Sequence, residues 1–354
     1  MLGPEARGFA QASLSAATLR CYSPAVLDYQ EWCRSNQLDD SVGGVNPVSV
    51  ASWMGWLAIH RTIKASTIEA YSSAVCTWHK WGTLSDGLEI GRSTAVSLVR
   101  AGIKKAKKPE EKAAAAAAER PADVTPKVLA KIVAVAPGTS DHAVMCIAAA
   151  SVALYGQLRP GELLGSRQHR DRALRLSQVI FWRDADQLES APVGRSVRDM
   201  GPTPHHFTID LGVTKADQLA DNEPYVVAAD PAVEALWNWL HLRAERRTPS
   251  ENIFTEEITR KDGERVWSPL AMAELLRQLT AWAAIARIDH RNFKGKSFRR
   301  GGAAALMEAG APADLQMAAG RWKVRRMPQL YAGPLPTKIR KSKDMAPAQP
   351  SARR

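Results

Sequence analysis

Residues Lys296 to Gly333 read KSFRRGGAAALMEAGAPADLQMAAGRWKVRRMPQLYAG, and this stretch decides how the chain is interpreted. Two adjacent arginines, Arg299 and Arg300, open a helical segment that is otherwise apolar and punctuated by glycine. Cations are unfavourable at the first turn of a helix because the helix dipole is positive there. The pair therefore predicts a compensating anion, and the stretch adds one tryptophan, Trp322, and one tyrosine, Tyr331.

The composition indicates a partner that carries negative charge. The 354 residues include 48 Lys and Arg against 36 Asp and Glu, which gives a formal net charge of +12 and a pI of about 9.7. Such a field favours nucleic acid or an anionic membrane surface. Neither a signal-peptide core nor a run of 18 apolar residues occurs. We therefore expect a soluble intracellular protein, nuclear in a eukaryotic host and otherwise cytoplasmic.

Motifs for metal or nucleotide chemistry are missing from the sequence. It has no Gly-rich phosphate loop, no HExxH and no GxSxG. The four cysteines are dispersed, without a CxxC pair or a histidine at ligand spacing, which argues against a zinc site and against disulfides. They are Cys21, Cys33, Cys76 and Cys146. We expect neither a cofactor nor a metal ion.

The clearest boundary is the basic and alanine-rich segment 103–126, which we interpret as a linker. It separates a domain over 1–102 from a second domain over 127–333, and a basic, proline-rich tail over 334–354 follows, for which disorder is the simpler interpretation. The linker's lysines could contact phosphate, although a charge run is as readily a solvated face. These lysines are Lys104, Lys105, Lys107 and Lys108.

Apolar periodicity predicts a helical first domain and a mixed second one. Before the linker, apolar residues recur at helical spacing, and Asn46-Pro47 and Ser66 have the form of helix starts. After it, three strand-like segments follow a long apolar helix, and helices are expected over 231–246, 268–286 and 298–308. The fold class is therefore mainly α, with a small antiparallel β-sheet in the second domain.

Three polar residues of the second domain are candidates for a site, although each has an ordinary interpretation. Arg159 and Glu162 lie in YGQLRPGELL at a turn between helices, where an ion pair at a helix terminus would suffice. Lys215 falls at a hairpin end in LGVTKADQ, where a solvated lysine is common. Taken one at a time, none of them indicates a function.

Taken together and in order, these residues resemble the motifs of the tyrosine recombinase, or phage-integrase, family. RPGE resembles its arginine followed by an acidic residue, and VTKADQ resembles its hairpin lysine. KSFR matches its His-x-x-Arg motif at Arg299 but has Lys296 in the histidine place. In GRW and LYAG, Trp322 precedes Tyr331 by nine residues, which is the family's final spacing. SFRRGGAAAL and GRWK are similar to transposon-encoded recombinases of the DIRS or Crypton type.

The resemblance covers nearly the whole chain and implies a two-domain clamp, with a helical DNA-binding domain and an integrase-like catalytic domain. It implies that Tyr331 attacks a DNA phosphodiester, that Arg159 and Arg299 bind the phosphate, and that Lys215 protonates the leaving oxygen. Trp322 would shape the pocket, Glu162 would act as an accessory residue, and Arg300 would contact DNA. Guanidinium groups suit this role because they bind phosphate oxygens in a bidentate manner.

The implied partner is double-stranded DNA carrying specific recombination sites, on which the family assembles as a homo-tetramer. Lys296 departs from the family, because a lysine does not exchange protons near neutrality as a histidine does. That departure leaves two alternatives open. A relative that has lost its chemistry would only bind DNA, and an enzyme of the type IB topoisomerase class would relax supercoils alone.

Overall fold

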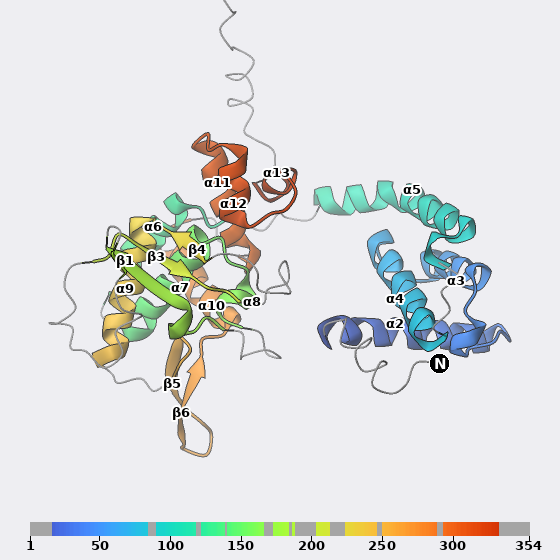
Figure 1. Cartoon of the computed structure of the whole chain (residues 1–354), viewed down its shortest axis with the longest axis horizontal. Coiled ribbons are helices and arrows are strands. Elements are labelled where there is room, and N and C mark those ends of the chain that lie inside the picture. Colours follow the sequence, from blue (N-terminus) through green and yellow to red (C-terminus); the bar gives the residue numbers. More distant parts are fainter. Residues whose placement is uncertain are drawn as a thin grey trace, which may run out of the picture. The chain divides into compact units, whose positions relative to one another are not determined.

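The chain divides into two compact units, Met1–Glu119 and Arg120–Arg354 (Figure 1). The computed structural model describes residues 16–83, 90–117, 122–138, 140–165, 173–183, 186–187, 203–212, 224–245, 250–288 and 293–332. In the described residues, no helix is both long enough and apolar enough to cross a membrane.

The division falls inside the segment expected to be a linker, but most of that segment is helix. Helix α5, Thr94–Ala117, belongs to the first unit and buries Ile103 in its core. Val124 is fully buried in the core of the second unit, where Thr125 caps the next helix. After Ile103, most of the described α5 residues are exposed, so this part of the segment is a solvated helix that begins inside the first unit.

The first unit consists of helices α2, α3, α4 and α5. The first three span Ala16–Ser35, Pro47–His60 and Ala65–Thr83, with 3-10 turns at Val42–Gly44 and Ile90–Arg92. Tyr29 and Trp53 lie edge to face in the core, 5.2 Å apart, and the Tyr29 hydroxyl bonds to Ser49 Oγ at 2.7 Å. The aromatics of this unit therefore form its core.

Two helix starts expected from the sequence have different outcomes. Asn46 caps α3 as expected, because its side-chain oxygen accepts from the Val48 and Ser49 N–H groups. The start expected at Ser66 is wrong, because α4 begins at Ala65 and the Glu111 carboxylate of α5 accepts the Ala65 N–H at 2.6 Å. A distant carboxylate thus replaces the local cap.

The second unit surrounds helix α7, Asp141–Tyr155, which is buried along most of its length. Its small residues, among them Ala148, Ala149 and Ala150, allow neighbouring helices to approach closely. Around it lie α6 Pro126–Val135, α8 Pro160–Leu163, α9 Asp230–Glu245, α10 Met272–Ile285, α11 Lys296–Glu308, α12 Ala313–Gly320 and α13 Met327–Ala332.

Two antiparallel sheets complete the second unit, so the fold is mainly helical as expected. The larger sheet has the order β2-β1-β3-β4, and Phe181 pairs with Phe207 at its centre. Its strands are β1 Val179–Arg183, β2 Asp186–Gln187, β3 His206–Ile209 and β4 Tyr225–Val227. The smaller sheet is a hairpin of β5 Thr255–Thr259 and β6 Arg265–Pro269 that extends away from the rest of the unit (Figure 1).

The hairpin corrects one expected helix, since Ser268 lies in β6 and helix α10 begins only at Met272. A turn signal was present in the sequence, because Asp262 and Gly263 stand between the strands and Gly263 has a φ of +84°. Asp-Gly between two β-rich segments is a strong hairpin signal. The helix expected from Ser268 therefore begins four residues later, at Met272, because the hairpin extends to Pro269.

The two glycines after the arginine pair allow α11 to lie close to its neighbours. A Cβ atom at Gly301 would collide with the carbonyl group of Val124. A Cβ atom at Gly302 would lie 2.7 Å from the Leu154 carbonyl oxygen on α7 and 2.9 Å from the Gln157 side chain. The sequence RRGG therefore joins two cations to a helix face without side chains, which brings Arg299 against the end of α7.

Candidate active site

Arg299 is almost completely buried, with 2% of its surface exposed. One guanidinium nitrogen donates to the carbonyl oxygen of Gln157 at 2.8 Å, and the other donates to the carbonyl oxygen of Gly320. The guanidinium carbon lies 5.0 Å from the ring of Trp322 and 5.4 Å from the ring of Tyr331. Three parts of the expected site, from α11, the end of α12 and α13, thus meet at this side chain.

The surroundings of Arg299 disfavour positive charge. Burial and, to a smaller extent, the positive charges of Arg159 and Arg321 together lower the pKa of its guanidinium to about 10, and the negative charge of Glu162 opposes them only in part. The group is still protonated at neutral pH, so three like charges are held close together. An incoming anion would relieve that repulsion, which is the usual electrostatic reason for anion binding at such a cluster.

Tyr331 and Trp322 lie side by side, with ring centroids 5.2 Å apart. Trp322 is buried and Tyr331 is partly exposed on the short helix α13. Gly320 is required for this arrangement, because a Cβ atom there would collide with the Trp322 ring. The spacing read from GRW and LYAG therefore corresponds to direct packing.

Arg159 and Arg321 share one carboxylate, that of Glu162. Glu162 Oε1 accepts from Arg159 Nη1 at 2.6 Å, and Oε2 accepts from Arg321 Nη2 at 2.7 Å. Oε2 also accepts from the Arg159 backbone N–H at 2.7 Å, which fixes the start of α8. Burial would raise the pKa of Glu162, but Arg321 and the bonds from Arg159 outweigh it and lower the pKa.

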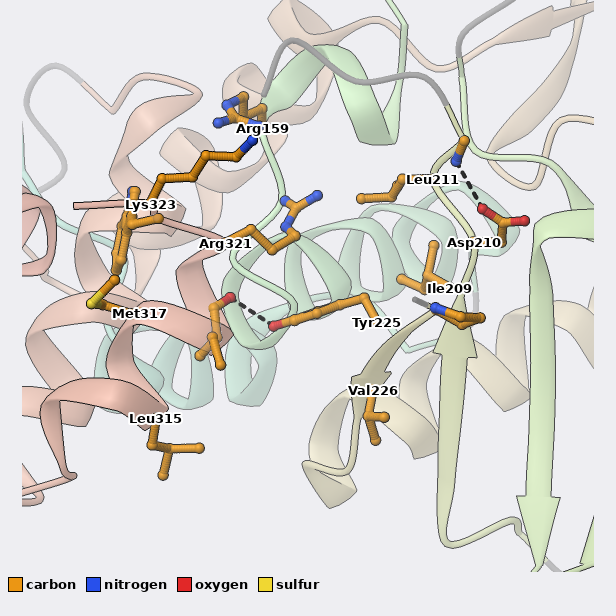
Figure 2. A pocket seen from close by; sticks show the side chains of 15 residues that line it. Arg159, Ile209, Asp210, Leu211, Tyr225, Val226, Leu315, Met317, Arg321 and Lys323 are labelled. Carbon is orange, nitrogen blue, oxygen red and sulfur yellow. Dashed lines mark hydrogen bonds between the residues drawn. The ribbon is translucent and has the colours of Figure 1, made fainter. Parts of the chain in front are cut away.

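A cavity of about 570 Å³ opens beside these arginines. Basic and aromatic side chains line one part of it, and apolar residues of β3, β4 and α12 line the rest (Figure 2). Arg321 lies over the ring of Tyr225, whose hydroxyl donates to the Ala319 carbonyl oxygen at 2.9 Å. The basic and aromatic lining residues are Arg159, Arg321, Lys323, Trp322 and Tyr225.

Three buried donors of this cluster have no hydrogen-bond partner among the described residues. They are Arg299 Nε, Arg321 Nε and the indole N–H of Trp322. Buried donors are normally satisfied, so a group of unsatisfied ones requires an explanation. An anion with several acceptor oxygens, such as a phosphodiester, matches this set of donors chemically.

Arg300 points away from this cluster, although it follows Arg299 directly. Its Nε donates to Asp123 Oδ1 at 2.5 Å, and Nη2 lies 3.3 Å from both the Ala122 carbonyl oxygen and Ser297 Oγ. Asp123 is therefore the compensating anion that the sequence predicted for the helix start. The expected contact of Arg300 with DNA stays a prediction.

The other expected site residues have different placements. Lys296 is exposed at the first position of α11, three residues before Arg299. Lys215 lies outside the described residues, so its expected role stays a prediction. The linker lysines lie on α5 in the first unit, where Lys104 Nζ pairs with Glu69 at 2.9 Å and Lys105 and Lys108 are exposed. Their phosphate contact, like that of the half-buried Lys107, stays a prediction.

Sequence reasoning missed Arg321 and its neighbours Tyr225 and Lys323. Arg321 stands inside GRW, but the motif drew attention to Trp322 alone. Its backbone is left-handed, with a φ of +50°, in the position after a helix that glycine usually occupies. The sequence signal for Arg321 was therefore an arginine directly after the end of a helix, at a position where the backbone conformation favours glycine.

The fold that carries this cluster is that of the tyrosine recombinases and integrases, as the sequence resemblance implied. The XerH site-specific recombinase bound to a palindromic difH substrate, in a post-cleavage complex, aligns with a TM-score of 0.54 and 12% identity, over 92% of this chain and 79% of XerH. The pre-cleavage complex of XerH with a difH substrate aligns with a TM-score of 0.52 and 13% identity, over 92% of this chain and 79% of that chain. No family model and no curated protein matches the sequence.

Proposed function

We propose that this protein is a site-specific DNA recombinase that cleaves and rejoins DNA strands through a 3′-phosphotyrosine intermediate. One observation carries the proposal: Arg299 lies against both Trp322 and Tyr331 while its charge is coupled to that of Arg159. Arg159, from a distant part of the sequence, is thus brought near the three motif residues of the segment 296–333. The fold supports the same class, because the XerH recombinases that share it are complexed with DNA substrates.

In the proposed reaction, the Tyr331 oxygen attacks the phosphorus atom of a phosphodiester. The new bond joins phosphorus to the tyrosine oxygen, and the bond to the 5′-oxygen breaks. Tyrosine has a reference pKa near ~10, so release of its proton to water on attack needs nearby positive charge. Arg159 and Arg299 would supply that charge and stabilise the additional negative charge on the phosphate oxygens in the transition state.

The leaving 5′-oxygen must gain a proton, which we assign to Lys215. The product holds the phosphate on Tyr331 and has a free 5′-hydroxyl group. Attack by the 5′-hydroxyl of another strand reverses the step, so joining needs neither ATP nor a metal ion. Lys296 would bind phosphate as a fixed cation, and its inability to exchange protons near neutral pH would affect the rate rather than the reaction class.

The proposed partner is double-stranded DNA with specific sites, bound by a homo-tetramer. The net charge of +12 supports attraction to DNA, and the α5 lysines are candidate phosphate contacts. A type IB topoisomerase would share the tyrosine chemistry but would act on supercoiled DNA without pairing two sites. Assembly on paired sites therefore separates these two activities.

The test is covalent capture on a nicked suicide duplex, in the absence of divalent ions. Wild-type protein, Tyr331→Phe and a control, Tyr155→Phe, would be incubated with the duplex or with a pool of random duplexes and resolved by denaturing electrophoresis. We expect wild type and Tyr155→Phe to give a slowed protein band that carries DNA, and Tyr331→Phe to give none. Tyr155 is a matched control because it is a partly buried tyrosine of the same unit.

The outcomes separate the alternatives. If all three proteins bind a verified site and none gives a covalent band, the chain is a DNA-binding relative without the chemistry. A covalent band that persists in Tyr331→Phe would place the nucleophile elsewhere. Relaxation of supercoiled plasmid without a requirement for paired sites would favour the topoisomerase class.

A further inference from the structure

Arg321 has a conformation and surroundings that its sequence position does not explain. Its backbone lies in the left-handed region, with φ of +50° and ψ of +49°, where glycine is favoured. Its side chain is nonetheless mostly buried, with 19% of its surface exposed, and lies over the Tyr225 ring. A residue held in an unfavourable backbone region points to a role for its side chain.

The side chain of Arg321 is directed at Glu162, the carboxylate that also holds Arg159. Glu162 Oε2 accepts both from Arg321 Nη2 and from the Arg159 backbone N–H, each at 2.7 Å, while Oε1 accepts from Arg159 Nη1 at 2.6 Å. The two Glu162 oxygens are thus divided between two guanidinium groups. Without Arg321, both oxygens would be available to Arg159 alone.

The shared carboxylate affects the net charge of the group formed by Arg159, Glu162 and Arg321. Arg159 and Glu162 as an isolated pair would cancel, and a neutral pair attracts phosphate weakly. With Arg321 added, two positive charges face one negative charge, so the group keeps an excess positive charge beside the cavity. Arg159, Arg321 and Lys323 all line that cavity (Figure 2).

We propose that Arg321 is a positioning residue that acts through Glu162 to keep the Arg159 guanidinium oriented and positively charged for phosphate binding. The inference rests on the proposed function, and it extends that function to a residue outside the motif positions. Arg321 occupies Glu162 Oε2, which prevents Glu162 from engaging the Arg159 guanidinium with both oxygens. The Arg159 guanidinium is thereby kept beside the cavity.

The test compares the single variants Arg321→Met, Arg321→Lys and Glu162→Gln with wild type. It also includes the double variant that carries both Glu162→Gln and Arg321→Met. The single-turnover rate of covalent capture is measured at saturating protein, and duplex affinity is measured separately. Arg325→Met is the matched control, because Arg325 is a nearby exposed arginine paired with Asp314. Circular dichroism melting identifies any variant that does not fold, and Arg321→Gly, which suits the left-handed backbone, serves as the second charge-removing variant.

We expect Arg321→Met to slow covalent capture by about 100-fold, the effect of misplacing a reacting group by roughly 1 Å. Duplex affinity should change by less than about 3-fold, because one buried charge contributes little to binding along the whole backbone. Arg321→Lys should recover most of the rate because it keeps a cation that can reach Glu162. In the Glu162→Gln background, adding Arg321→Met should slow the reaction little further, because the coupling partner is already changed.

Each other outcome has a definite meaning. If wild-type protein gives no covalent product, the proposed function fails and this inference fails with it. If wild type reacts and folded Arg321→Met or Arg321→Gly reacts as fast, the inference alone is overturned. It is also overturned if Arg321→Lys is no better than Arg321→Met, or if the effects of the Glu162 and Arg321 substitutions multiply as independent changes.

Discussion

Arg243 and Arg299 are two buried arginines of the second unit, and they are satisfied in different ways. Arg243, 4% exposed, donates to the carbonyl oxygens of Ser250, Asn252 and Ile253 and to Thr255 Oγ1. Arg299, 2% exposed, donates to two carbonyl oxygens and faces two aromatic rings, with Nε left without a partner among the described residues. The first is a structural arginine, and the second is poised for another anionic partner.

The pKa values of the two side chains agree, but their causes differ. Burial lowers the pKa of Arg243 to about 10, and the negative charge of Glu251 counteracts that effect. Burial and the positive charges of Arg159 and Arg321 together lower the pKa of Arg299 to about 10, and the negative charge of Glu162 opposes them only in part. A structural site therefore relieves the burial of charge, whereas the candidate active site accumulates like charge that an anion would relieve.

The largest expected effect is on stability, from Arg243→Met. The substitution removes the donor of the Ser250 carbonyl oxygen and one donor each of the Asn252 and Ile253 carbonyl oxygens, which keep bonds from Thr255 Oγ1 and the Trp239 indole N–H. We expect the free energy of unfolding to fall by roughly 3 to 5 kcal/mol, because hydrogen bonds from a charged donor contribute roughly 1.5 to 3 kcal/mol each. Urea unfolding followed by circular dichroism measures it. A loss below about 1 kcal/mol would mean that the hydrogen bonds of Arg243 contribute little to the stability of the fold.

The next effect is on chemistry, from Arg299→Lys. Lysine keeps the charge but loses the planar fork and the ring stacking, so phosphate would be held less precisely. We expect covalent capture to slow by about 100- to 1000-fold, which is the effect of losing one donor to a transition-state charge. Arg243→Lys is the matched control and should lower stability while the folded protein retains the rate. Equal capture rates for wild type and Arg299→Lys would show that Arg299, like Arg243, has no role in the chemistry.

A smaller and pH-dependent effect is expected from Glu162→Gln. The pKa of Glu162 is lowered in the folded state, so its ionised form stabilises the fold above the unfolded pKa of about 4.3, and that contribution disappears as the pH falls through the folded pKa. We expect a loss of about 1 to 3 kcal/mol at pH 7 that shrinks below about pH 4.

Urea unfolding across pH 3 to 8 measures the difference between wild type and Glu162→Gln. Arg243→Met is the comparison, because the oxygens that Arg243 contacts are carbonyl and hydroxyl groups, which do not titrate in this range. Its loss should change little with pH. A Glu162→Gln difference that stays constant down to pH 3 would show that the carboxylate is not held ionised by the two arginines.

The sequence singled out Arg299, Trp322 and Tyr331 because each has a distinctive chemistry at a distinctive spacing, and the structure places the three in contact, while their catalytic roles stay predictions. Arg299, Trp322 and Tyr331 lie within 33 residues of one another, and their contacts follow from one helix, one turn and a second short helix. Their order with Arg159 led to the fold, which the structure confirms.

The rest depended on contacts between distant segments, which local patterns do not encode. Arg300 was expected to face DNA, but its partner Asp123 lies 177 residues earlier in the chain. Arg321 reaches Glu162 across 159 residues. The linker was expected to begin at Ile103, whereas helix α5 runs through that position from Thr94 and packs Ile103 into the core of the first unit. In each case tertiary packing decided a choice that the local sequence left open.

The smallest expected effect comes from Arg300→Met, which completes the comparison with a third arginine. Arg300 pairs with Asp123 at 2.5 Å, and 16% and 22% of the two side chains are exposed, so water screens this part-buried pair only in part. We expect the free energy of unfolding to fall by about 1 kcal/mol, the upper range for ion pairs near the surface. Covalent capture should stay within about 3-fold of wild type, because the guanidinium points to the segment before α6. A larger loss of capture rate with an unchanged stability would assign Arg300 to DNA after all, as the sequence first suggested.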